Sequence, residues 1–295
     1  MRRKRRILHH LQYEVFLLPA VLAFTLFTFY PLVKTLLYSV TDFDGISHTY
    51  NFVGLRNYAA VFKDDVMKQA LFNTLFYTFF TVIMINCIAI PLAVCLDKTQ
   101  RIKTFERAVF FFPSVISALL LGYIWTYILS PLKTGALNSL LGLFGIGPIG
   151  FTSGSWSAKF SIIFVALWAN TGWHTTIYIA YLQAIDPTYY EAAAIDGATR
   201  FQQFRAITIP LLAPALTVNT LLLLTNGLKV YDLPYAITKG GPGYANYTVT
   251  QIIIQRGISE RQYGVSTALA AIFILLVMVI SVVQFTTMSK REVEV

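Results

Sequence analysis

Charge is scarce in this sequence: Asp, Glu, Lys and Arg together make up 13% of its 295 residues. A soluble globular domain carries about twice that fraction. Hydrophobic residues account for 56% of the chain, and the mean hydropathy is +0.61. These values exclude an ordinary soluble domain and predict a protein that crosses a membrane several times. The net charge of +9 then requires no nucleic-acid partner, because basic residues collect in the cytoplasmic loops of such proteins.

Residues for redox, metal or nucleotide chemistry are also few. The two cysteines, Cys87 and Cys95, lie in one apolar stretch without further metal ligands beside them. None of the four histidines has metal-ligand spacing. The sequence has no Gly-x-x-x-x-Gly-Lys-Ser/Thr phosphate-binding loop. We therefore expect no catalytic site, no metal and no cofactor, so that any ATP would be hydrolysed by another chain.

Six apolar segments each reach the roughly 20 residues that a membrane helix needs. They cover about residues 15–37, 71–96, 109–129, 160–182, 211–231 and 265–287. The sequence thus predicts an all-α polytopic membrane protein with six transmembrane helices in one domain, 1–295. Lys and Arg cluster before the first segment and again within residues 98–107. Because cytoplasmic loops retain positive charge, both termini and the loop at 186–210 are expected inside the cell membrane.

The loop at 186–210, called the inner loop below, reads as an ordered element. Asp186 can cap a helix, and Glu191 with the three alanines after it favours continuation of that helix. Gly197 favours a turn, and a second helix is expected to run from there until Pro210 ends it. The pattern predicts helix, turn and helix, with a face of small residues that another protein can approach closely.

The inner loop resembles the EAA loop of the membrane subunits of binding-protein-dependent ABC importers. The match consists of Glu-Ala-Ala, a glycine four residues later and a closing Ile-x-Ile-Pro, with Ile209 where the family usually has Leu. In that family the loop docks into a cleft on a cytoplasmic ATPase. Arg200 and Arg205 would either pair with acidic groups of that ATPase or lie against lipid headgroups. The resemblance implies ATPase-coupling roles for Glu191, Ala192, Ala193, Gly197, Ala198 and Pro210.

Three outer stretches extend the resemblance over nearly the whole chain. NFVGLRNYAAVF at 51–62 predicts a short surface helix, and KVYDLPYAITKGGP at 229–242 ends in a glycine-rich turn. Both, together with Gly-Ala-Leu-Asn at 135–138, are similar to stretches of carbohydrate importers, the MalF/UgpA-like sugar permease family. The resemblance implies the type I ABC importer permease fold. It also implies a second homologous permease subunit, two cytoplasmic ABC ATPase subunits and an extracellular or periplasmic sugar-binding protein.

Polar residues inside the apolar segments are costly and tend to face a pathway or a neighbouring helix. Asn219 and Asn226 are seven residues apart and share a helix face, and amides with aromatic rings suit a neutral sugar. Lys229 fits either pathway contact or simple snorkelling to the outer interface. Asn73 and Asn86 are expected to make hydrogen bonds between helices instead. The expected substrate pathway consists of Asn219, Asn226, Gly227, Lys229, Trp173, His174 and Tyr123.

The implied function is that of a membrane-spanning subunit of an ATP-driven importer for a di- or oligosaccharide. An ion-coupled secondary sugar transporter is the alternative, but it would need a buried carboxylate, and Glu14 and Asp232 are the nearest to a membrane interior. A scaffold or sensor that recruits a soluble partner through the inner loop is a third possibility. Sugar-phosphate esters would require a cluster of intramembrane arginines, which the apolar segments lack, so a neutral sugar is favoured.

Overall fold

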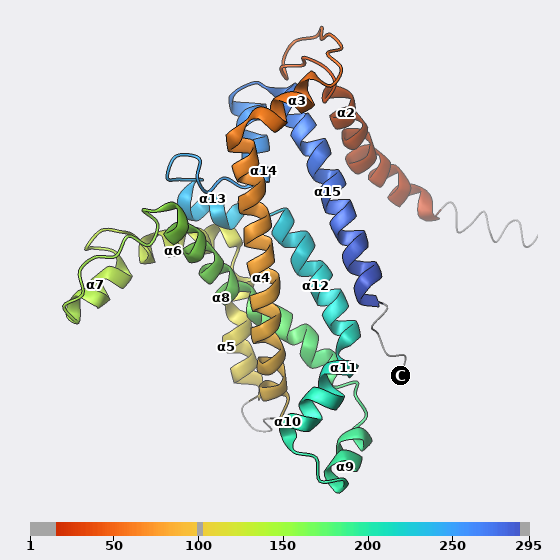
Figure 1. Cartoon of the computed structure of the whole chain (residues 1–295), viewed down its shortest axis with the longest axis vertical. Helices are drawn as coiled ribbons and strands as arrows, with labels where there is room; N and C mark the ends of the chain where they lie inside the picture. Colours follow the sequence, from red (N-terminus) through yellow and green to blue (C-terminus); the bar gives the residue numbers. More distant parts are fainter. Residues whose placement is uncertain (1–15, 99–102, 290–295) are drawn as a thin grey trace, which may run out of the picture. The chain divides into compact units, whose positions relative to one another are not determined.

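A computed structural model describes residues 16–98 and 103–289, and Figure 1 traces their helices. Within these residues the one strand-like feature is an isolated bridge between Thr41 and Phe52. The expectation of an all-α protein is therefore confirmed. The basic N-terminal cluster, Glu14 and residues 99–102 lie outside the described residues.

The helices fall into two compact units, each described here by itself. The first unit combines residues 1–64 with 253–274, and the second combines 65–252 with 275–295. The single-domain organisation stays a prediction. In the first unit, the helical run Phe16–Tyr38 includes a π-helix, and the predicted surface helix forms. Its elements are η1 (Thr25–Phe29), α2 (Tyr30–Tyr38), α3 (Arg56–Lys63), η3 (Gln255–Ser259) and the start of α15 (Tyr263–Ser289).

Hydrogen bonds order the long connection between α2 and α3 in the first unit. Asn57 is buried, and its Nδ2 donates to the carbonyl oxygens of Ser39 at 3.0 Å and Thr41 at 2.7 Å. The amide of Gly264 donates to the carbonyl oxygen of Phe43 at 2.9 Å. This connection is thus held by its own side chains and by the start of α15.

The second unit is centred on α4, α8 and α12. The helix α4 packs along both α8 and α12, while α5 packs on α8 and α13 packs on α6. Ile85, Tyr178 and Ala215 are among the buried side chains where the three central helices meet. The elements of this unit are α4 (Asp65–Lys98), α5 (Lys103–Val115), α6 (Ala118–Ile128), α7 (Ala136–Leu143), α8 (Ser155–Leu182), α9 (Thr188–Ile195), α10 (Arg200–Gln203), η2 (Phe204–Thr208), α11 (Ile209–Leu211), α12 (Ala213–Leu228), α13 (Asp232–Thr238) and most of α14 (Val249–Ile254).

The third apolar segment is not one straight helix, although hydropathy alone predicted a span over 109–129. The helices α5 and α6 meet at a bend of 94°. Pro113 has no N–H to donate, and the amide of Ile116 bonds to the carbonyl of Pro113 at 3.3 Å. Ser117 then leaves helical geometry, with φ −53° and ψ 133°. The segment therefore changes direction where its helical hydrogen bonding is interrupted.

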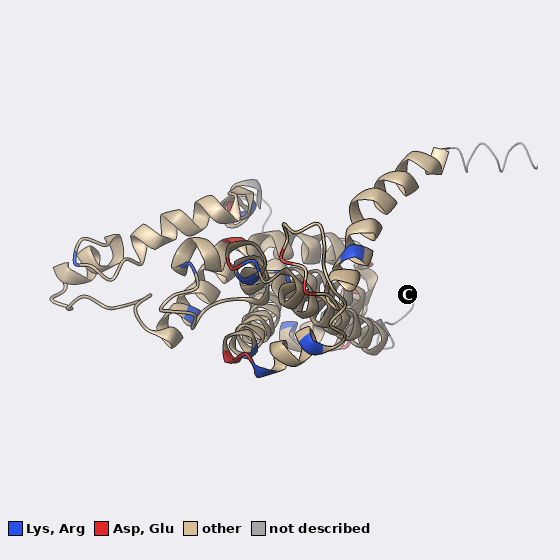
Figure 2. Ribbon diagram, turned by 90° about the horizontal axis from the view of Figure 1, so that it is seen from above, with Lys and Arg blue, Asp and Glu red and all other residues tan. Residues whose placement is uncertain are grey.

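Three helical segments of the described chain, Phe16–Tyr38, Asp65–Asp97 and Tyr263–Met288, are long and apolar enough to cross a membrane. Counting two bent helix pairs as single spans raises the number to five. The 28 residues of α8 would extend about 42 Å, but its polar stretch at 170–176 lowers its mean hydropathy. Charged residues are few on the ribbon of Figure 2. The count of six spans stays a prediction.

Candidate functional site

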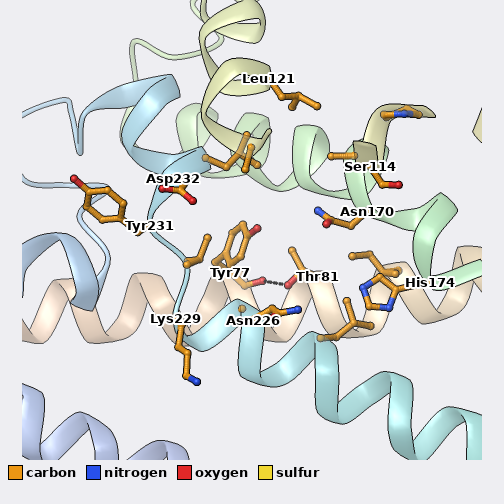
Figure 3. Close-up of a pocket in the computed structure, with 18 of the residues that line it drawn as sticks. Tyr77, Thr81, Ser114, Leu121, Asn170, His174, Asn226, Lys229, Tyr231 and Asp232 are labelled. Carbon is orange, nitrogen blue, oxygen red and sulfur yellow. Dashed lines mark hydrogen bonds between the residues drawn. The ribbon is translucent and has the colours of Figure 1, made fainter. Parts of the chain in front are cut away.

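A cavity of about 440 Å³ lies among α4, α8, α12 and the break between α5 and α6. Figure 3 shows polar side chains from these elements around it. Tyr77 and Thr81 come from α4, Asn170 and His174 come from α8, and Asn226 comes from the last turn of α12. The cavity therefore offers amide, hydroxyl, imidazole and aromatic groups within one unit of the chain.

Four of the predicted pathway residues border this cavity: His174, Asn226, Gly227 and Lys229. Gly227 is buried, whereas Asn226 and Lys229 are exposed. In Figure 3 the ammonium of Lys229 points away from the cluster formed by Tyr77 and Thr81. Lys229 therefore borders the cavity with its ammonium directed away from these two side chains.

Three predicted pathway residues do not line the cavity. Asn219 is fully buried at 0% exposure, and its Oδ1 hydrogen-bonds Nδ1 of His174. Trp173 and Tyr123 are exposed, at 38% and 49%, but stand outside the lining. Asn219 therefore reaches the cavity only through His174. A pathway role for Asn219, Trp173 and Tyr123 stays a prediction.

Tyr77 and Thr81 line the cavity but are not among the predicted pathway residues. Thr81 Oγ1 donates to the carbonyl oxygen of Tyr77 at 2.8 Å. A signal was present, because Asn73, Tyr77 and Thr81 are spaced four residues apart and share one helix face. A stripe of polar residues on one face of an apolar segment is thus the sequence signal for both residues.

The aromatic rings at the cavity are not those of the predicted pathway residues Trp173 and Tyr123, and two further tryptophans nearby pack on each other. Trp125 of α6 and Trp168 of α8 pack edge to face with their ring centroids 5.5 Å apart. Tyr77 and Tyr231 supply rings to the cavity instead. Trp125 follows the bend between α5 and α6, and hydropathy carries no information about that bend.

The lining carries charges of both signs. Lys229 contributes an ammonium group and Asp232 a carboxylate. These are the charged residues that the described lining contains besides the titratable His174. The formal charges of these two side chains sum to zero, so the lining carries no net charge that would favour an anionic or a cationic ligand.

Asn86 makes hydrogen bonds between helices, as predicted. Asn86 Nδ2 donates to Thr220 Oγ1 at 3.2 Å, and Asn86 Oδ1 accepts from the hydroxyl of Tyr178 at 2.6 Å. Asn86 thus joins α4, α8 and α12. For Asn73 the predicted bond to another helix is not found, because its Nδ2 donates to the carbonyl oxygen of Ala245 at 2.8 Å, in the turn after α13.

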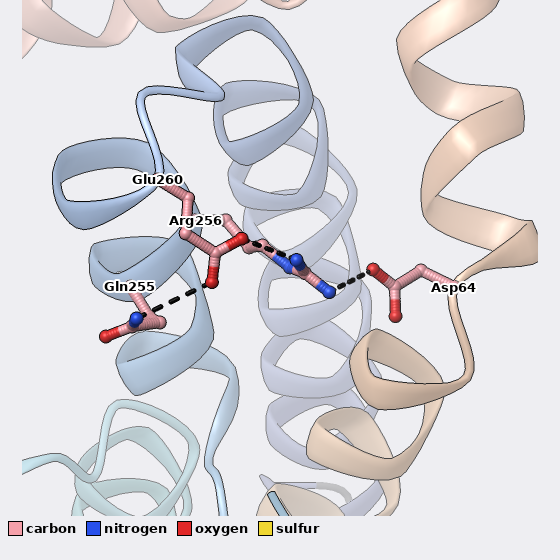
Figure 4. Close-up of polar contacts among 4 residues, drawn as sticks. All are labelled: Asp64, Gln255, Arg256 and Glu260. Carbon is pink, nitrogen blue, oxygen red and sulfur yellow. Dashed lines mark hydrogen bonds and ion pairs between the residues drawn. The ribbon is translucent and has the colours of Figure 1, made fainter.

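The first unit has a polar cluster of its own around Arg256 (Figure 4). The guanidinium lies 2.7 Å from a carboxylate oxygen of Asp64 and 2.5 Å from one of Glu260. These side chains are 21–25% exposed, so the ion pairs are only partly screened by solvent. The cluster ties the end of α3 to the turn before α15.

Among the described residues, no group of three His, Cys, Asp or Glu side chains can hold a metal ion.

The inner loop begins with a short helix that displays Glu191. Asp186 Oδ1 accepts from the amide of Thr188 at 2.9 Å, just before α9. This backbone hydrogen bond, helped by the side chain of Thr188, lowers the pKa of Asp186 below its ordinary value of 3.8. Glu191 lies in the first turn of α9 and is exposed. Its carboxylate is therefore available to a partner protein.

A glycine turn and a capping box separate the two helices of the inner loop. Gly197 has φ +78°, a conformation that side chains with a Cβ rarely adopt. The amide of Ala198 donates back to the carbonyl of Ala193 at 2.9 Å. Thr199 then starts α10, and its side chain and that of Gln202 cap each other's backbone amides. The expected helix, turn and helix are present.

One side-chain contact joins the two halves of the inner loop. The hydroxyl of Tyr190 in α9 lies 3.0 Å from Thr208 Oγ1 in η2. Thr208 is 4% exposed, so this bond is largely shielded from water. The second helical run ends at Leu211, one residue beyond Pro210, where the sequence analysis expected the end.

The inner loop and the cavity share two helices. The helix α8 contributes His174 to the cavity and ends at Leu182, shortly before α9. The helix α12 starts at Ala213, directly after the inner loop, and carries Asn226 to the cavity. A displacement of the inner loop would therefore reach the cavity wall along two continuous helices.

Comparison with known proteins gives a consistent result. The family described as "Binding-protein-dependent transport system inner membrane component" matches residues 69–294. The "Probable starch degradation products transport system permease protein AmyD" of Thermoanaerobacterium thermosulfurigenes is 32% identical over 283 residues, which cover 96% of this chain and 95% of the relative. The "Multiple sugar-binding transport system permease protein MsmF" of Streptococcus mutans is 29% identical over 291 residues, covering 98% and 99%.

A solved structure has the same fold. The crystal structure of a bacterial ABC transporter involved in the import of the acidic polysaccharide alginate contains a chain with a TM-score of 0.87 and 21% sequence identity. The match covers 98% of this chain and 99% of that chain. The helices of both units thus follow a path already seen in an ABC transporter.

Proposed function

This chain belongs to the family of binding-protein-dependent transport system inner membrane components, and from that membership we propose that it is the membrane-spanning subunit of an ATP-driven sugar importer. In this role it forms half of a translocation pathway. It couples to an ATPase through residues 191–210 of the inner loop. The chain is a transport component rather than an enzyme.

One observation carries this proposal: the helices α8 and α12 both border the polar cavity and both adjoin the inner loop. A transport subunit that is driven by a separate ATPase needs a mechanical link between the surface that contacts the ATPase and the cavity that holds the solute. Rigid-body movement of packed helices can then change access to the cavity without any local chemistry. Glu191, Ala192, Ala193, Gly197, Ala198 and Pro210 are the residues proposed to dock on the ATPase.

A di- or oligosaccharide is the proposed substrate. The relatives named above transport starch degradation products or multiple sugars, by the words of their names. The cavity supports the same class, because amides and hydroxyls can bond sugar hydroxyls, and the rings of Tyr77 and Tyr231 can cover sugar C–H faces. Lys229 is the only Lys or Arg in the described lining, which disfavours a phosphate dianion.

The proposed partners are a second homologous permease, two ATPase subunits and a sugar-binding protein outside the cell. The family is defined by dependence on a binding protein. The chain itself has no phosphate-binding loop, so the ATPase must be separate. Exposed Glu191 and a 71% exposed Phe201 give the inner loop a mixed polar and apolar surface for such a partner.

We also propose six membrane spans with both termini in the cytoplasm. Five candidates come from the apolar helices and bent pairs, and α8 would be the sixth. The basic residues at the N-terminus and within 98–107 support this orientation. The ion-coupled alternative has no comparable support, because the named relatives are permease proteins of transport systems and Asp232 is an exposed carboxylate.

Reconstitution tests the proposed function. The chain is co-expressed with the partner permease and ATPase of its host, purified and placed in proteoliposomes with its binding protein. The binding protein is first assayed against a panel of neutral oligosaccharides and sugar-phosphate esters. We expect binding of a neutral sugar and ATP hydrolysis that this sugar stimulates only when the binding protein is present. Uptake without ATP would contradict the proposal.

The docking role of the inner loop predicts a specific phenotype for Glu191→Lys. Reversing this exposed charge should leave membrane insertion intact and lower ATP-driven uptake at least tenfold, because the polar contact with the ATPase is lost. Asp196→Lys is the matched control, since Asp196 is an exposed carboxylate at the other end of α9. Normal uptake by Glu191→Lys, or equal loss in both variants, would count against the docking assignment.

A further inference from the structure

One side-chain contact leads from the cavity wall into the buried interior of the second unit. His174 borders the cavity and is 3% exposed. Its Nδ1 meets Oδ1 of Asn219, which is 0% exposed. His174 therefore has one ring edge held by a fully buried amide, while the ring takes part in the cavity wall at the end opposite Tyr231 and Asp232 (Figure 3).

The orientation of the Asn219 amide follows from its second contact. Asn219 Nδ2 lies 3.5 Å from the backbone carbonyl oxygen of His174 and donates to it. The amide oxygen is then the atom that faces the imidazole. Because a carbonyl oxygen can only accept, Nδ1 of His174 must carry the hydrogen.

The other ring nitrogen is then an acceptor. A charged imidazole at 3% exposure would need an opposite charge beside it, and Asp232 lies at the far end of the cavity in Figure 3. The ring is therefore neutral, and a neutral imidazole with hydrogen on Nδ1 has a bare lone pair on Nε2. Asn219 thus decides which hydrogen-bonding role His174 offers to a ligand.

We propose that His174 is a specificity-determining residue that accepts a hydrogen bond at Nε2 from a sugar hydroxyl, and that Asn219 is the positioning residue that fixes this tautomer. The inference rests on the proposed function and narrows its substrate class. A hydroxyl can donate to Nε2, whereas a carboxylate or phosphate oxygen cannot. At this position the cavity favours a neutral sugar over an acidic one.

A buried asparagine away from the cavity provides a matched control. Asn73 on α4 is 5% exposed, and its Nδ2 donates to the carbonyl oxygens of Ala245 and Tyr247. It does not border the cavity. Asn73→Ala removes buried hydrogen bonds of the second unit, as Asn219→Ala does, but leaves the contact between Asn219 and His174 in place. A purely structural role for Asn219 would make the two variants behave alike.

The test uses the reconstituted complex with its binding protein and a neutral oligosaccharide. This sugar is maltotriose, or another neutral oligosaccharide from the panel that the binding protein is found to bind. The measured quantity is sugar molecules moved per ATP hydrolysed. His174→Ala and Asn219→Ala should each lower this ratio at least tenfold. The double variant should lower it no further, because both changes abolish the same hydrogen-bond acceptor, Nε2 of His174. His174→Gln should recover part of the ratio, since its amide oxygen can replace Nε2. Asn73→Ala should change the ratio less than twofold.

Three results would overturn the inference: multiplied losses in the double variant, an equal loss in Asn73→Ala, or an unchanged ratio in Asn219→Ala. Co-purification of the ATPase with each variant shows that the complex is assembled. If the wild-type complex moves no sugar with ATP, the proposed function itself fails, and this result is distinct from failure of the variants.

Discussion

A single hydroxyl-to-hydroxyl contact, between Tyr190 and Thr208, joins the two helices of the inner loop. Each helix has other internal bonds, but those hold the turn at Gly197 and the start of α10. We expect this contact to help fix the angle between α9 and η2. The proposed coupling to an ATPase would need that angle to be fixed.

We therefore expect Tyr190→Phe to loosen the inner loop without unfolding the protein. The loss of one hydrogen bond, about 1 kcal/mol, corresponds to about fivefold faster opening. Hydrogen exchange of the amides in α9, followed by mass spectrometry, measures this change. Tyr189→Phe is the control, because Tyr189 is the residue directly before Tyr190 and is 45% exposed. Equal exchange in the two variants would show that the contact does not hold α9.

At the scale of elements, the packing of α5 on α8 depends on Gly172. A Cβ at this position would collide with the backbone carbonyl of Phe110 in α5. Small residues are the usual means by which membrane helices bring their backbones together. The same packing positions the break between α5 and α6, which forms one wall of the cavity.

Gly172→Ala should consequently push α5 away from α8 and destabilise the protein by about 1–3 kcal/mol, the usual cost of overpacking. The expected readout is a melting temperature several degrees lower in detergent. Gly142→Ala in α7 is the matched control, because a Cβ there meets no atom within 4 Å. A melting temperature that is unchanged in Gly172→Ala would contradict the close approach of the two helices.

Local signals in the sequence were sufficient for the short elements. Gly197 and the Thr199–Gln202 pair specify a turn and a helix start within a few residues, and α3 forms where periodicity placed it. The bend after Val115 was not predictable from hydropathy, because apolar content says nothing about direction. The burial of Asn219 and the cavity position of Tyr77 depend on how α4, α8 and α12 pack, which no single segment encodes.

At the scale of the whole molecule, the proposed orientation puts the inner loop and the α2–α3 connection on opposite sides of the membrane. His48 lies in that connection and is exposed, and Asp196 lies in the inner loop and is exposed. Both positions are suited to chemical labelling from solution. The chain's own cysteines, Cys87 and Cys95, are replaced by Ser first.

In intact cells, a membrane-impermeant maleimide should label His48→Cys and leave Asp196→Cys unlabelled. Permeabilised cells should give labelling at both positions, which serves as the control for reactivity. The expected outcome follows from the basic residues near the N-terminus and within 98–107, which favour the cytoplasmic side. Labelling of Asp196→Cys from outside would reverse the orientation and remove the inner loop from reach of any cytoplasmic ATPase.

The break between α5 and α6 has a consequence for how such importers diverge. Pro113, Ser114, Ile116 and Ala118 all border the cavity at this break. Irregular main chain at membrane depth is tolerated where it lines a cavity, since its carbonyl and amide groups find partners there. The carbonyl groups belong to the peptide bond, so no point mutation deletes them. A change of substrate during evolution would then come from side chains on the opposite wall of the cavity. The main chain of this stretch would continue to offer hydrogen-bond acceptors to any substrate rich in hydroxyl groups.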